Sequence, residues 1–390
     1  MAYYYIFPET DTTLYSHPDR KTMNAGSDEL LELVKEPGST DQYHHPSRIL
    51  IKFKNDDILK AITLMGDATF TSSADSTVNL QLQIADTKNL TSTHVINAHA
   101  VSQSWDEGTG RYLNLPTASN GSSWIYRDNT TVATKWATSC FGVNGRTGSI
   151  SSSLLTQGGG TYYTGSDFYG TQQFLEGEVL DTNIDVKSIV NKYSASLNAG
   201  KVYPEGILNY GFLLKTLDSV EADVNTSFGE IQYFSSNTHT IYPPKLEFAW
   251  NDVINQTGNY DTNLIKRSGS LHISLEDNKK EFNQEEIVKI RINVRDKYPE
   301  RSFDNESNYL KNNRLKTGKS SYSIRDAHTE RVIIPFHDVY TNISNDGESS
   351  FFKLYMNGLQ PERYYRILIK LEEITETQIF DDNYFFKVVR

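Results

Sequence analysis

The sequence predicts an all-β protein built from two consecutive β-sandwiches. Aromatic residues make up 12% of the chain, including 24 Tyr and 18 Phe, and such residues suit half-buried pleated surfaces. Apolar and polar residues alternate along many short segments, as in strands with one face toward solvent. A length of 390 residues is too great for one core and indicates two or three domains.

The first 250 residues contain the strands of the first sandwich. The most regular is 78–84, VNLQLQI, where every second residue is aliphatic. Two short helices are expected, over 56–64 and near 188–196. The other expected strands are, in order, 3–7, 47–53, 95–101, 180–190 where it runs into the second helix, 209–214, 229–234 and 245–250.

Between these strands, about residues 108–170 form a long loop insertion rich in Ser, Thr, Gly and Asn. Long loops inside compact domains are uncommon and tend to be functional. The insertion carries large aromatic side chains that could stack on sugar rings or anchor a protein partner. Alternatively, these rings pack the loop against its own sandwich. The candidate contact residues are Trp124, Tyr126, Trp136, Tyr162 and Tyr163.

A series of motifs in fixed order resembles the disaggregatase-related β-sandwich modules known as DNRLRE domains. It begins with QSWDEGT at 103–109 and continues with IDVKSIV at 184–190, NYGFLLK at 209–215 and PKLEF at 244–248. The resemblance implies a jelly-roll-like sandwich over residues 1–255, whose relatives are non-catalytic carbohydrate-binding modules. It also implies that Trp105 packs in the sandwich and that Gly108 turns the chain.

A linker over 256–269 and a second sandwich over 270–390 complete the expected organisation. Seven short strands separated by polar turns are typical of an immunoglobulin or fibronectin type III sandwich. The segment LQPERYY at 359–365 resembles the approach to the tyrosine corner of fibronectin type III domains, which implies that the Tyr365 hydroxyl returns to the backbone. The expected strands are 270–275, 286–294, 322–326, 332–336, 350–356, 365–371 and 383–389.

No catalytic constellation is found, so we expect neither enzymatic activity nor a cofactor. Asp106 and Glu107 are adjacent, and adjacent strand residues point to opposite faces, so they are not placed to flank one bond. The single cysteine, Cys140, excludes an intrachain disulfide and a cysteine-based zinc cluster. The chain contains no phosphate-binding loop and no nucleophile elbow.

The spacing of the histidines argues against a zinc site. A calcium site is not excluded by this argument. The pairs His44–His45 and His94–His99 diverge in an extended chain and do not match a zinc motif. Calcium prefers loop oxygens, and predicted loops carry three aspartates. These are Asp11, Asp19 and Asp41.

Charge and hydropathy exclude two classes of partner. The formal charge is −11, with 17 basic and 27 acidic residues in 1–250 and 21 basic and 22 acidic in 251–390. An acidic body does not suit a phosphate backbone, which needs clustered Lys and Arg. No apolar run approaches the roughly 20 residues that span a bilayer. The start of the chain shows no signal-peptide pattern, so we expect synthesis in a cytoplasm.

Residues 290–299, 352–359 and 380–388 resemble virion structural proteins of contractile-tailed phages, especially those of marine cyanobacteria. This resemblance implies a non-enzymatic neck, tail or baseplate component, present in multiple copies and docked to other virion proteins. The alternative is an adhesin or carbohydrate-binding module for host glycans. A third hypothesis is an unrecognised hydrolase.

Overall fold

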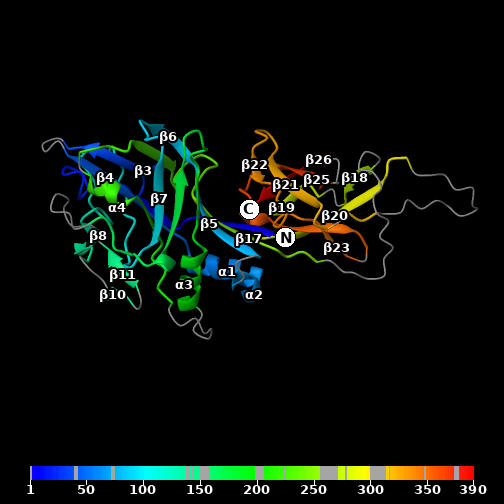
Figure 1. Cartoon of the computed structure of the whole chain (residues 1–390), viewed down its shortest axis with the longest axis horizontal. Coiled ribbons are helices and arrows are strands. Elements are labelled where there is room, and N and C mark those ends of the chain that lie inside the picture. The colour runs from blue at the N-terminus through cyan, green and yellow to red at the C-terminus, as the bar shows by residue number, and fades with distance from the viewer. Residues whose placement is uncertain are drawn as a thin grey trace, which may run out of the picture. The chain divides into compact units, whose positions relative to one another are not determined.

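The computed structural model confirms the all-β class, with 45% strand and 11% helix (Figure 1). The structure describes residues 2–38, 43–71, 75–137, 141–142, 145–148, 158–197, 206–223, 225–254, 271–276, 279–298, 313–315, 317–346, 348–372 and 377–390. The predicted linker over 256–269 and Cys140 lie outside these residues.

The chain divides into two compact units, and the division is not one cut in the sequence. The N-terminal unit consists of Ile6–Leu64 and Val78–Glu247. The C-terminal unit consists of Met1–Tyr5, Met65–Thr77 and Phe248–Arg390. The sequence-based boundary near residue 255 therefore leaves out two early segments that belong with the C-terminal strands.

The large sheet of the N-terminal unit is curled like half a barrel. Its strand order is β13-β7-β15-β4-β3-β16-β6, and β2 also pairs with β4. The sequence did not predict β2, β3, β6 or β13 as strands. The strands are β2 (Thr10–Tyr15), β3 (Leu30–Pro37), β4 (His44–Lys52), β6 (Ile84–Lys88), β7 (His94–Ala100), β13 (Tyr169–Phe174), β15 (Phe212–Thr216) and β16 (Glu230–Phe234).

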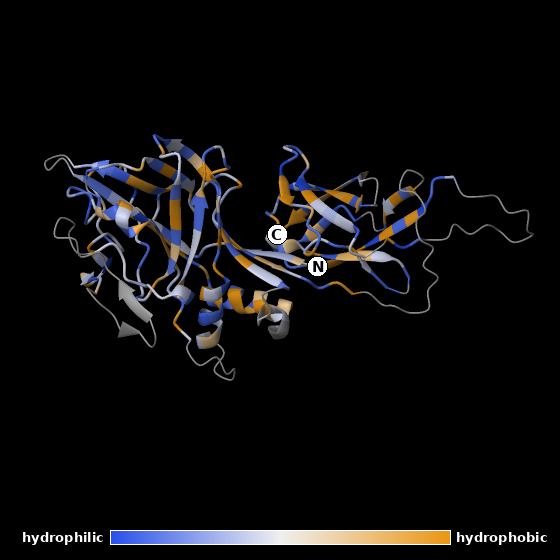
Figure 2. Ribbon diagram, in the orientation of Figure 1, coloured by the Kyte–Doolittle hydropathy of each residue, from blue (hydrophilic) through white to orange (hydrophobic). Residues whose placement is uncertain are grey.

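A four-stranded sheet has the order β1-β17-β5-β14. Its strands are β1 (Ala2–Ile6), β17 (Lys245–Trp250), β5 (Ser76–Leu82) and β14 (Thr182–Asp185). Burial alternates along β5 without a break, as the sequence predicts, and hydropathy banding along the strands is visible in Figure 2. The helices are α1 (Asn55–Met65), α2 (Asp67–Thr71), α3 (Lys187–Leu197) and α4 (Asp218–Ala222).

The insertion contains short strands rather than a structureless loop. These are β8 (Tyr126–Asp128), β9 (Thr134–Lys135), β10 (Phe141–Gly142), β11 (Gly145–Gly148) and β12 (Tyr162–Tyr163). β8 pairs with β9, and β10, β11 and β12 form a small sheet. The insertion is thus a folded covering with its own backbone pairing.

The C-terminal unit is a two-sheet sandwich with the strand order of an immunoglobulin domain. All seven predicted strands form, and two short ones, β19 and β23, were not predicted. One sheet has the order β18-β20-β24-β23, which corresponds to ABED. The other has the order β19-β26-β25-β21-β22, in which β26-β25-β21 correspond to GFC and β19 and β22 flank them. The strands are β18 (Leu271–Leu275), β19 (Glu281–Asn283), β20 (Ile287–Asp296), β21 (Ser320–Asp326), β22 (Val332–Ile334), β23 (Ser344–Asn345), β24 (Ser350–Tyr355), β25 (Tyr364–Glu372) and β26 (Thr377–Val389).

Aromatic side chains explain why the first residues belong to this unit. Tyr3 and Tyr5 lie in its core cluster, and the Tyr5 hydroxyl donates to the carbonyl of Ile333 at 3.2 Å. A Cβ atom on Gly358 would lie 2.7 Å from the Tyr5 ring. The first strand therefore packs so closely that position 358 has no room for a side chain.

Tyr365 occupies a tyrosine corner. Its ring is buried, and its hydroxyl donates to the carbonyl of Gln360 at 2.9 Å. Burial raises the pKa of Tyr365, and the charge of Arg363 partly opposes this. The hydroxyl therefore stays protonated and fixes the turn that leads into β25.

We expect Tyr365→Phe to destabilise the C-terminal unit by about 1 kcal/mol, because a hydrogen bond at a buried corner is lost. Chemical unfolding of the full chain, followed by the transition of this unit, measures the change. The control is Tyr364→Phe, which removes the hydroxyl of the neighbouring exposed ring and should leave the transition in place. Equal effects of the two variants would contradict the corner role.

Candidate functional site

Three of the predicted contact residues in the insertion lie in the interior. Trp124, Trp136 and Tyr162 are 1%, 6% and 3% exposed and pack in one cluster that includes Leu50 and Leu213 of the sheet. Rings in this position are not accessible to a partner or a sugar, so that prediction is corrected for these three residues. They pack the insertion onto its own sandwich, which was the alternative.

The remaining two aromatic candidates, Tyr126 and Tyr163, are half-buried. The Tyr163 ring stacks on Phe168 with 5.0 Å between ring centroids. Tyr126 belongs to β8, and its carbonyl accepts a hydrogen bond from the Ser123 amide at 2.8 Å. Both residues take part in local pairing, and the five candidates do not form a single exposed surface.

A buried charge cluster, which sequence analysis missed, fastens the insertion. Arg48 of β4 donates to both carboxylate oxygens of Glu221 in α4, at 3.2 and 2.8 Å, and to the carbonyl of Gly159 at 2.6 Å. Lys215 lies 3.1 Å from the same carboxylate, and its side chain and that of Glu221 are fully buried. A cation inside the apolar strand SRILIK was the available sequence signal.

The same guanidinium lies against the aromatic rings of the insertion. Arg48 is 5.0 Å from the ring centroid of Trp124 and 5.5 Å from that of Tyr162, distances that favour cation–π attraction. Burial opposes the charge of Arg48, but Glu221, Tyr162 and Asp218 together outweigh burial, so the pKa of Arg48 is raised. Gly159 has φ +78°, and a Cβ there would lie 2.7 Å from the Trp124 ring. This glycine therefore lets the backbone reach the guanidinium.

Trp105 and Gly108 lie where the insertion begins. Trp105 packs at the edge of the insertion cluster and donates its indole N–H to the carbonyl of Tyr210 at 2.8 Å. Gly108 has φ +77°, and a Cβ there would lie 2.5 Å from the backbone oxygen of Asn120. Asp106 accepts a hydrogen bond from Thr130. The stretch is a packed turn.

Glu107 and Asp11 bring two carboxylates together at this turn. Glu107 accepts from the Asp11 amide at 3.0 Å, and Asp11 accepts from the Ser236 amide at 2.6 Å. The other Asp11 oxygen is buried without a hydrogen-bond partner in the described part of the chain. Burial raises the pKa of Asp11 to about 7, against the bonds from Ser236 and with a further contribution from Glu107.

The residues considered as metal ligands are dispersed. Asp11 lies in strand β2 rather than in a loop, and Asp41 lies outside the described residues. The His94 ring stacks on Phe174, and burial lowers the pKa of His99 to about 4 despite its contact with the Tyr163 carbonyl. Within the described ranges, no three His, Cys, Asp or Glu side chains are grouped to hold a metal ion.

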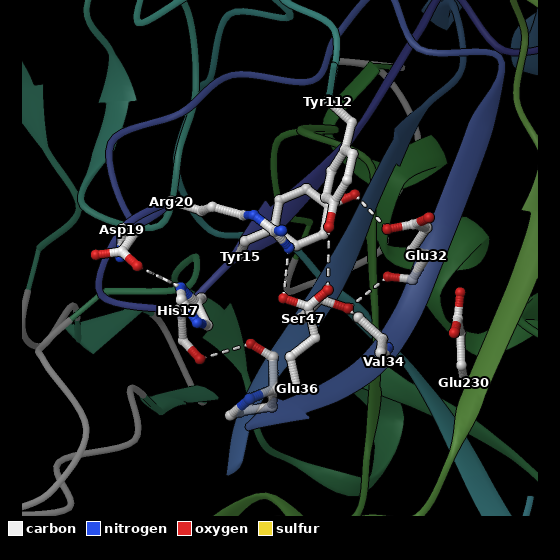
Figure 3. A network of polar contacts seen from close by, with 12 residues as sticks. Tyr15, His17, Asp19, Arg20, Glu32, Val34, Glu36, Ser47, Tyr112 and Glu230 are labelled. Atoms are coloured by element: carbon white, nitrogen blue, oxygen red, sulfur yellow. Dashed lines mark hydrogen bonds and ion pairs between the residues drawn. The ribbon is translucent and has the colours of Figure 1, made fainter. Parts of the chain in front are cut away.

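A second polar network lies over β3 and joins two loops to it (Figure 3). Tyr15 donates to Glu32 at 2.7 Å, and Gln232 donates to the other oxygen of Glu32 at 2.9 Å. Tyr112 and Arg20 donate to the two oxygens of Glu36 at 3.2 and 2.5 Å.

All four carboxylate oxygens of Glu32 and Glu36 thus have donors. Burial raises the pKa of Glu32, with Tyr15 opposing and Glu230 adding to the effect. Arg20 also lies 4.2 Å from the ring centroid of Tyr112. Because its donors and acceptors are paired internally, the network closes the surface over β3 and holds the insertion down.

The strongest exposed candidate is in the C-terminal unit, on the outer side of the five-stranded sheet. Arg325, Arg366 and Phe385 are cross-strand neighbours on β21, β25 and β26, and Tyr364 lies two residues before Arg366. Phe385 is 40% and Tyr364 47% exposed. We name these four residues the outward patch. Exposed aromatic rings among arginines are typical of protein interfaces.

Neither a scan against protein-family models nor a search of curated proteins gives a match for this chain. The resemblances to DNRLRE modules and to phage virion proteins stay predictions. Over the described residues, no helix is both long and apolar enough to span a bilayer.

We expect Arg48→Met to destabilise the N-terminal unit by about 3–5 kcal/mol, because it removes the main partner of a buried carboxylate. Denaturant unfolding measures this loss, and limited proteolysis should show the insertion cut first. Lys52→Met is the control, since Lys52 and its partner Glu9 are partly exposed and such pairs contribute less than about 1 kcal/mol. Similar losses in the two variants would contradict the fastening role of Arg48.

Asp11 predicts an unusual pH dependence of stability. Its pKa of about 7 in the folded state exceeds its ordinary value of 3.8, so between these values the folded state holds a proton that the unfolded state releases. Stability therefore falls as pH rises through this window. Wild type should lose roughly 2–3 kcal/mol of stability between pH 5 and pH 8.5 through this group, and Asp11→Asn should not show this fall because an amide does not titrate.

Denaturant unfolding at several pH values between 5 and 8.5 tests this expectation. The control is Asp86→Asn, which neutralises an exposed carboxylate and should run parallel to wild type. If the Asp11→Asn curve also runs parallel to wild type, the buried carboxyl is not the cause of the pH dependence.

Proposed function

We propose that this chain is a non-enzymatic virion structural protein, at the neck, tail or baseplate of a contractile-tailed phage. It docks to neighbouring virion subunits through β-sandwich surfaces. The observation that carries the proposal is the outward patch, in which the exposed rings of Tyr364 and Phe385 lie beside Arg325 and Arg366. The resemblance of 290–299, 352–359 and 380–388 to virion proteins supports a place in a particle.

The packing of the N-terminal unit also supports a scaffold. The aromatic rings of the insertion and the Arg48–Glu221 pair hold a long segment tightly onto the sheet. The network of Glu32 and Glu36 holds two further loops. Side chains that are paired within the chain stabilise the unit and leave contacts with other subunits to its exposed surfaces.

A second candidate function, host-glycan binding, is favoured by one exposed ring. Tyr169 on β13 is 37% exposed and stacks on His99 with 5.2 Å between ring centroids. The exposed residues Thr171 and Gln173 follow it on the same face, so a ring and hydrogen-bonding groups lie together. Glycan-array binding that Tyr169→Ala abolishes would favour this alternative.

We expect purified phage particles to contain the chain in multiple copies, at positions that cryo-electron microscopy resolves. In complementation with plasmid-borne variants, Phe385→Ser should reduce incorporation, because it removes an exposed anchor of the outward patch. Ile287→Ser is the matched control, being 49% exposed on β20 in the other sheet. Absence of the wild-type chain from particles would overturn the proposal.

A further inference from the structure

We infer that the outward patch binds the same patch of a second copy of this chain, which forms a two-fold symmetric dimer. This inference rests on the docking role proposed above and names the occupant of the surface. It is carried by the order of charge and aromatic character across three neighbouring strands.

The three-residue row has a cation at one end and a ring at the other. Arg325 of β21 is the register partner of Arg366 of β25, and Arg366 is the register partner of Phe385 of β26. Neighbouring strands lie about 4.8 Å apart, so the ends of the row are separated by roughly 10 Å. Arg366 stands at the centre of the row.

The charges at the centre are already neutralised within the chain. Glu330 accepts from Arg366 at 2.5 Å and lies 3.9 Å from Arg325. Asp381 also pairs with Arg366. Two arginines and two carboxylates leave the row without net charge, so a strongly acidic partner is not specially favoured and a second copy is not repelled.

A two-fold axis along β25 makes this row complementary to itself. In a dimer of this kind each contact occurs twice, and rotation about that axis places Arg325 of one copy opposite Phe385 of the other. A guanidinium over an aromatic ring is an attractive contact. Tyr364 and Arg366 each meet the same residue of the other copy near the axis, and the two Arg366 side chains do not repel strongly because each is paired with Glu330 and Asp381 of its own chain. If the two-fold axis instead ran perpendicular to the strands, Arg325 of one copy would face Arg325 of the other. That arrangement would form no contact between a guanidinium and an aromatic ring.

The guanidinium groups are suited to this contact. Their side chains are only 29% exposed for Arg325 and 22% for Arg366. The Nε atoms of both are shielded from solvent without a hydrogen-bond partner in the described part of the chain. Phe385 remains 40% exposed although Arg366 lies 5.8 Å from its ring centroid. The patch is thus preorganised and partly dehydrated before any partner arrives, which lowers the cost of association.

Analytical ultracentrifugation of the purified full chain tests the dimer. We expect a concentration-dependent species of twice the 44.3 kDa chain mass. Phe385→Ala and Arg325→Met should each weaken self-association about tenfold or more. Ile287→Ala, on the other sheet, should leave it unchanged, and circular dichroism checks that all variants fold.

Mixing the variants tests the geometry. Homodimers of Arg325→Met or of Phe385→Ala lose both cation–ring contacts. A mixed dimer keeps one of the two, because the Arg325 of one copy still meets the Phe385 of the other. Differently labelled variants should therefore form mixed dimers more tightly than either forms homodimers.

Three outcomes overturn the inference: a monomer at all concentrations, a dimer insensitive to both substitutions, or no gain on mixing. Incorporation into particles is a separate readout. If the chain is monomeric but present in particles, the dimer is refuted and the structural role stands. If the chain dimerises but is absent from particles, the structural role is refuted and the dimer stands.

Discussion

The N-terminal unit depends on one buried interaction, the pair between Arg48 and Glu221. A charge in an apolar interior is stable only when it is paired and fully hydrogen-bonded. Arg48 meets this requirement by drawing together three segments: its own strand, the helix that carries Glu221, and the backbone of Gly159. The insertion's position follows from this requirement, and its aromatic rings then fill the space around the guanidinium.

This arrangement explains which parts of the fold were predictable. The alternation of apolar and polar residues predicted β5, in which one face is buried and the other faces solvent. It did not predict β3, LLELVKEP, whose outer face is covered, so that Val34 on that face is buried with Tyr15. For the same reason, the sequence did not indicate the role of the insertion. Trp124 and Trp136 occur in a polar loop and were predicted to be exposed contacts. They are core residues because they pack against the sheet beneath them.

In the C-terminal unit, local patterns were sufficient for the strands and insufficient for the surface. Seven alternating segments and the approach to Tyr365 give the sandwich, because each is a property of neighbouring residues. The outward patch joins Arg325, Arg366 and Phe385, which become neighbours only through strand register. Neither local hydropathy nor spacing along the chain determines that register, so the sequence did not reveal the patch.

The two units therefore use aromatic residues and arginine in opposite ways. In the N-terminal unit, Arg48 lies against Trp124 and Tyr162 with no solvent access, so the contact stabilises the fold and offers nothing to a partner. In the C-terminal unit, Arg366 lies beside Phe385 with both partly exposed. The same cation–ring attraction there leaves part of the Phe385 side chain open to a further contact, since Phe385 is 40% exposed. Residual attraction of this kind is what an interface uses, which is why the docking role is placed on the outward patch.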